Sequence, residues 1–152
     1  MQPCHERFDD VRQRAKTRRI AVVVALASLL AGCSAADPLE VAAGDLVSSA
    51  ATVALVLEEH EAGHLPTAAA ETAVDDAVRE VAAAGGTLAE LSLDGGAEAV
   101  RAELVTTSAS LVLVLHDVSD ALADGRSTDA ASQDLETVLD DLEGLEQEAA
   151  HR

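Results

Sequence analysis

Residues 37–62 read DPLEVAAGDLVSSAATVALVLEEHEA, and this stretch decides the fold class of the chain. Asp37 stands as a capping residue before Pro38, which suits the first helical position, and Glu40 follows three residues after the cap. This order is typical of a helix start. Apolar or small residues then recur at alternating steps of four and three, which predicts one buried helical face. They are Leu39, Ala43, Leu46, Ala50, Val53 and Leu57.

Three further segments carry the same kind of spacing, and turns containing glycine or proline separate them. Within the second segment, Gly85-Gly86 predicts a kink or break, after which Thr87 begins another capping sequence. Four amphipathic helices joined by short turns predict an all-α fold, an antiparallel up-down four-helix bundle over residues 38–150. The predicted helices span about 38–62, 66–92 (with the break at 85–86), 96–123 and 128–149.

Two short apolar runs leave an alternative open. Residues 53–57 (VALVL) and 111–115 (LVLVL) could each form a buried strand. The long helical stripes that flank both runs, and the lack of aromatic residues, favour helices.

Two pairs of segments within the chain have similar sequences. Residues 45–57 (DLVSSAATVALVL) match residues 103–115 (ELVTTSASLVLVL) at six of 13 positions, and residues 71–76 (ETAVDD) match 136–141 (ETVLDD) at four of six. The two offsets, 58 and 65, differ by seven, so the same helical face is kept. The similarity predicts a duplicated helical hairpin.

Residues 1–32 differ in kind from the rest, with six basic residues before the uncharged apolar stretch Ile20–Ala31. This is the order of a secretory signal, and the stretch is too short to span a membrane stably. It ends in Leu30-Ala31-Gly32-Cys33, which resembles the lipobox of bacterial lipoproteins. The resemblance implies removal of residues 1–32, acylation of Cys33, a short tether over 33–37, and anchoring to the outer face of the cell membrane.

The alternatives are an ordinary signal or an uncleaved anchor with a chance cysteine. Thr17-Arg18-Arg19 partly resembles a twin-arginine export signal, so the export route stays open.

The remaining chain is strongly acidic. From Cys33 on it holds 25 of the 28 acidic residues but only four arginines and no lysine, a net charge of −21. Nucleic acid is excluded as a partner, because binding to phosphates needs clustered basic residues. Anionic headgroups should repel the domain, so only the lipid would hold it at the membrane. The single aromatic residue, Phe8, and the second cysteine, Cys4, both lie in the predicted signal peptide and would be removed with it. Stacking platforms and disulfides are therefore excluded as well.

The sharpest chemical motif is His60-Glu61-Ala62-Gly63-His64, which resembles the H-E-x-x-H pattern of zinc peptidases. The resemblance implies that His60 and His64 bind zinc and that Glu61 acts as general base. The metzincin extension is lacking, since Thr67 and Ala70 stand where a glycine and a histidine would be needed. A glutamate third ligand could be Glu80, Glu90 or Glu98, and nothing in the sequence singles one out.

A milder hypothesis needs no catalysis. His60 and His64 are expected to continue the core stripe of the first helix, and His116 should lie near the same end of the bundle. With nearby acidic residues they could bind Zn²⁺ or another divalent transition metal. Solvated histidines on an acidic surface are the alternative.

Leu55 and Leu113 fall outside the core stripes of their helices and are equivalent under the 58-residue offset. Outward leucines suggest a surface for a protein partner or for self-association. The leading interpretation is a membrane-anchored, non-catalytic helical interaction module that needs no cofactor. A metal-binding lipoprotein and, third, a minimal zinc peptidase are the alternatives.

A Cys33→Ser substitution tests the predicted anchor. The variant should stay unprocessed or be released from the membrane, because no other residue can carry the acyl group. Fatty-acid labelling followed by mass spectrometry of the N-terminus measures this. Continued labelling of the variant would contradict the assignment.

Overall fold

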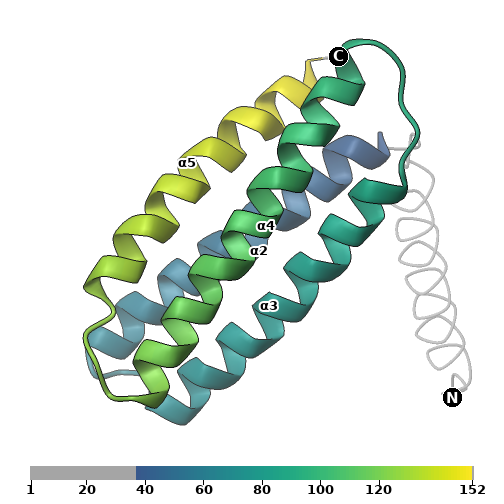
Figure 1. Ribbon diagram of the computed structural model, residues 1–152. Helices are drawn as coiled ribbons and strands as arrows, with labels where there is room; N and C mark the ends of the chain where they lie inside the picture. Colours follow the sequence, from purple (N-terminus) through teal and green to yellow (C-terminus); the bar gives the residue numbers. More distant parts are fainter. Residues whose placement is uncertain (1–36, 152) are drawn as a thin grey trace, which may run out of the picture. The chain divides into compact units, whose positions relative to one another are not determined.

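The computed structural model describes residues 37–151, and they form four α-helices (Figure 1). The predicted signal peptide, the acylation site Cys33 and the start of the tether lie outside the described residues. The helices are α2 (Pro38–Glu61), α3 (Thr67–Glu90), α4 (Gly96–Ala123) and α5 (Asp129–Ala150). The predicted boundaries hold to within two residues. The two apolar runs that could have formed strands lie inside α2 and α4.

Each helix packs against two neighbours and runs antiparallel to them (Figure 1). α2 lies between α3 and α5, and so does α4, which places α2 and α4 on one diagonal with little contact between them. The prediction of an all-α, up-down four-helix bundle is confirmed. The start of α2 also agrees with the sequence, because the Asp37 carboxylate accepts a hydrogen bond from the Leu39 backbone N–H at 2.9 Å.

One core runs through the bundle and contains only leucine, valine and alanine. The apolar residues that periodicity placed on the inner face of α2 are all buried, among them Leu46, Ala50 and Val53. The same is true of their counterparts 58 residues later, Leu104, Ser108 and Leu111, although Ser108 is polar. The two similar segments therefore occupy corresponding places on the diagonal pair α2 and α4.

The predicted break at Gly85-Gly86 is wrong, because α3 continues through both residues. A Cβ atom at position 85 would lie 2.8 Å from the Oγ of Ser108 on α4, whereas one at position 86 would meet nothing. Gly85 thus permits close approach of the two helices and does not act as a hinge. The Thr87 hydroxyl bonds to the Ala83 carbonyl, one turn back in the same helix, so it does not cap a new helix.

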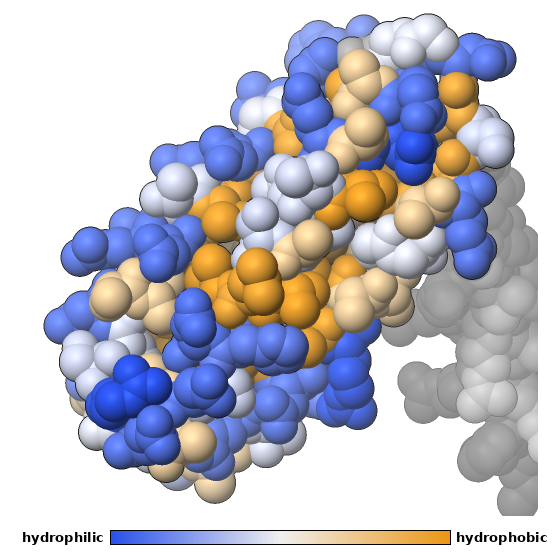
Figure 2. Space-filling view, viewed as in Figure 1, coloured by the Kyte–Doolittle hydropathy of each residue, from blue (hydrophilic) through white to orange (hydrophobic). Residues whose placement is uncertain are grey.

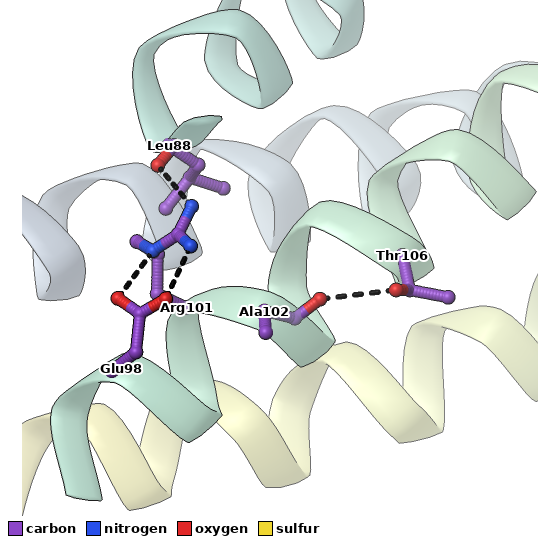
Figure 3. Close-up of polar contacts among 5 residues, drawn as sticks. All are labelled: Leu88, Glu98, Arg101, Ala102 and Thr106. Atoms are coloured by element: carbon purple, nitrogen blue, oxygen red, sulfur yellow. Dashed lines mark hydrogen bonds and ion pairs between the residues drawn. The ribbon is translucent and has the colours of Figure 1, made fainter. Parts of the chain in front are cut away.

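The α3–α4 turn is fastened by Arg101 (Figure 3). Its guanidinium donates to the Leu88 carbonyl near the end of α3 at 3.2 Å and to the Glu98 carboxylate through Nε at 2.8 Å. The Leu88 carbonyl thereby gains a donor at the end of its helix. The hydrogen bond from Arg101 lowers the pKa of Glu98 and raises that of Arg101.

By length and composition, α2 and α4 could each cross a membrane. In the bundle they bury their apolar stripes against α3 and α5, whose outer faces carry many exposed carboxylates. A bilayer that surrounded this bundle would have to take up those charges, at high cost. The core accounts for only part of the apolar character of α2 and α4, because 39% and 28% of their most apolar stretches are buried in the bundle.

Alanine at the two adjacent glycines gives a matched test of the α3–α4 packing. Gly86→Ala should raise the free energy of unfolding by about 0.5–1 kcal/mol through helix propensity. The free energy of unfolding of Gly85→Ala should be about 1 kcal/mol or more below that of Gly86→Ala, because the new methyl group overpacks against Ser108. Adding Ser108→Ala should recover part of that difference. Urea unfolding measures all three variants, and equal stabilisation at both glycines would contradict the close approach.

Candidate functional site

The H-E-x-x-H segment does not lie on one helix. α2 ends at Glu61, and Gly63 takes a left-handed conformation (φ 76°) that reverses the chain. The backbone N–H groups of His64 and Leu65 both donate to the Glu59 carbonyl, which closes the helix end. Such a glycine-based closure is a common helix terminus. His64 therefore lies in the turn that leads to α3, beyond the last helical residue.

The two histidines make separate local contacts. His60 is partly buried, and its Nδ1 lies 2.9 Å from the Leu65 carbonyl, to which it donates. His64 Nδ1 lies 3.0 Å from a carboxylate oxygen of Glu59, and its side chain is 70% exposed. The prediction that both histidines continue the core stripe of the first helix is wrong for His64, whereas His60 lies on α2 and is partly buried. Helical periodicity stops at Glu61, and the reversal at Gly63 carries His64 out to solvent.

Glu61 joins two turns of the bundle. Its carboxylate accepts a hydrogen bond of 2.8 Å from the hydroxyl of Thr128, a buried residue between α4 and α5. His116 is exposed on α4. Within residues 37–151, no group of three or more His, Cys, Asp or Glu side chains has an arrangement that could hold a metal ion. The structure therefore does not bring His116 together with His60 and His64 as one set of ligands.

Leu55 and Leu113 both lie on the surface, 57% and 66% exposed. The only other large apolar side chain of comparable exposure in the described part of the chain is Val41, near the start of α2. Apolar surface gathers over the middle of the face that α4 presents in Figure 2. Exposed or partly buried apolar residues of α4 are Val105, Val112, Leu113 and Val114.

Leu55 also borders a groove of about 480 Å³ between α2 and α5, which the sequence analysis did not find. The buried residues Leu57 and Leu135 lie at its floor, and the partly buried Leu139 lines it as well. Small residues of α2, Ala51 and Ala54, make up one side. Exposed carboxylates flank it, from Glu58, Glu61 and Glu136.

The corresponding place on α4 differs. Under the 58-residue offset, Ala54 corresponds to Val112, which packs against the core, and Glu58 corresponds to His116. A valine in place of an alanine fills space beside the neighbouring helix. Both surfaces therefore carry an exposed leucine, Leu55 on α2 and Leu113 on α4. Of the corresponding positions, only those of the α2/α5 groove hold an alanine and a glutamate, Ala54 and Glu58.

The acidic surface is largely uncompensated. Each of the three described arginines pairs with an acidic residue close to it in sequence, namely Arg79 with Asp76, Arg101 with Glu98 and Arg126 with Asp124. A second groove, between α4 and α5, is also acidic, and Thr106 and Thr107 help to line it. Comparisons with protein-family models, with curated proteins and with solved structures found no match.

A double-mutant cycle tests the role assigned to Glu61. Thr128→Val removes the hydroxyl at similar volume and should lower the free energy of unfolding by about 1 kcal/mol, the usual contribution of one hydrogen bond. Glu61→Ala should cost a similar amount, and the double variant little more than either alone. Urea unfolding at neutral pH measures the cycle. Additive costs would show that the two side chains do not interact.

Proposed function

We propose that this protein is an exported lipoprotein whose helical bundle binds a protein partner and catalyses no reaction. The observation that carries the proposal is the exposure of two equivalent leucines, Leu55 and Leu113, on a bundle whose surface is otherwise largely polar and acidic. Burying such side chains in an interface stabilises association, and interface cores are typically poorer in charge than the surrounding surface.

The anchor supports this function. Cys33 stands four residues before the Asp37 cap, so an acyl chain on Cys33 would tether the bundle close to a membrane. Leu55 is 17 residues into α2, about 25 Å along the helix from its first residue at 1.5 Å per residue. The net charge of −21 opposes adsorption of the bundle to an anionic bilayer. The leucines would thus be held near the membrane and remain free for a partner.

The turn that carries His60 and His64 does not support peptidase chemistry. A zincin requires both histidines one helical turn apart, with the glutamate free to act on a bound water. In this chain His64 lies beyond the helix, and Glu61 is engaged by Thr128.

Photo-crosslinking in cells tests the proposal. A photoreactive amino acid at position 55 or 113 of the full chain should give crosslinks to the same defined partner on repeated trials, because these positions would lie within the interface. The matched control is position 75, an exposed residue of α3. Crosslinking that is no stronger at 55 and 113 than at 75 would contradict the proposal.

Charge substitutions provide the second arm of that experiment. Leu55→Glu and Leu113→Glu should each weaken association, while the unfolding midpoint changes little because both side chains are exposed. Thermal unfolding followed by circular dichroism measures the midpoint. If either substitution unfolds the bundle, the leucines belong to the core and the proposal loses its basis.

A further inference from the structure

We propose that the groove between α2 and α5 binds a basic amphipathic helix of a partner protein. This inference rests on the proposed function and deepens it, because it names the chemistry of the partner and the surface that receives it. The groove combines an apolar interior with acidic margins, and these two features specify the two faces of the ligand.

The interior defines the apolar face. The floor and sides are mainly aliphatic, with Leu135 and Leu139 from α5 opposite Ala51, Ala54 and Leu55 from α2. Ser132 of α5 also lines the groove, and its buried hydroxyl has no hydrogen-bond partner among the described residues. Along α2 the lining extends from Ala51 to Glu61, about 15 Å at 1.5 Å per residue. That length matches roughly three turns of a helix. A helix laid along the groove would place aliphatic side chains every three or four residues against this floor, a recognised mode of peptide recognition.

The margins define the charge. Three exposed carboxylates line the groove, those of Glu58, Glu61 and Glu136, and no basic residue does. Glu61 is held by Thr128, which leaves Glu58 and Glu136 on opposite sides, one on α2 and one on α5. Since the described arginines are each paired with a nearby acid, compensating charge has to come from outside the described residues. Lysine or arginine flanking the apolar stripe of the ligand supplies it.

The same charges argue against a second copy of this chain as the occupant. Two copies of a domain with a net charge of −21 would bring acidic surfaces together, and like charges facing each other across an interface are costly. The α4/α5 groove is a poorer candidate because a single leucine, Leu145, lines it, whereas four leucines line the groove between α2 and α5. The Leu113 surface differs in having the larger Val112 where the groove has Ala54, and His116 where the groove has Glu58.

A synthetic peptide serves as the probe. It is a helical 14-residue sequence with leucines at a spacing of three and four, lysines flanking them, and one tryptophan in the apolar stripe. The chain contains no tryptophan or tyrosine, so the fluorescence reports the peptide alone. Residues 37–152 form a compact unit that contains the whole described core, so the chain from residue 33 on, with Cys33→Ser, is used without its lipid. At about 50 mM salt we expect saturable binding with a blue shift of the tryptophan emission.

Matched variants locate the site. Glu58→Gln with Glu136→Gln should weaken binding about tenfold, whereas Glu103→Gln with Asp141→Asn, which removes the same charge from the α4/α5 groove, should change it less than twofold. Leu55→Ser should weaken binding about tenfold and Leu113→Ser less than twofold. A peptide with glutamate in place of lysine should not bind.

Equal weakening by the two charge pairs would overturn the proposal, because it would show diffuse attraction to the acidic surface. Absence of binding would overturn it too, as would sedimentation showing a dimer that Leu55→Ser abolishes. If the peptide result is negative while cellular crosslinks persist at position 113, the groove inference fails and the interaction function stands. Loss of specific crosslinks at both leucines would remove the proposed function itself.

Discussion

Close helix spacing is the constraint on which this bundle depends. Its core contains no aromatic side chain, and many of its contacts are made by alanine, so the helices must approach one another closely to exclude water. At Gly85 the approach is so close that α3 leaves no room for a Cβ atom beside Ser108. Small residues in helix interiors, which propensity alone would count as weaknesses, are what make the packing possible.

A narrow core also shapes the surface. Small side chains leave room for grooves between adjacent helices. Ala51 and Ala54 of α2 line such a groove between α2 and α5. The corresponding residue on α4 is the larger Val112. The surfaces around Leu55 and Leu113 therefore differ in the residue beside the leucine, although the two segments are similar. The acidic exterior then limits which molecules can approach either of them.

Periodicity predicted most of the fold because a helix in a bundle repeats its core contacts every three or four residues. The four helices, their limits to within two residues and the outward direction of Leu55 and Leu113 followed from that rule. The prediction of a break at Gly85 was wrong because the glycine there accommodates Ser108, which lies on another helix. His64 was misplaced because the core stripe was extended past residue 62, where the predicted helix already ended, and the reversal at Gly63 turns the chain out of that stripe. The groove between α2 and α5 was not predicted, because its prediction requires knowing which two helices are neighbours.

α2 and α4 run parallel, and each carries its exposed leucine 17 residues after the first helical residue. The two leucines therefore both lie towards the second half of their helices, although these helices are diagonal to each other. Under the proposed lipid anchor at Cys33, partners that share the membrane would meet the bundle by diffusion in two dimensions and from opposite sides. Such a geometry favours rows within the plane of the membrane over stacks that grow away from it.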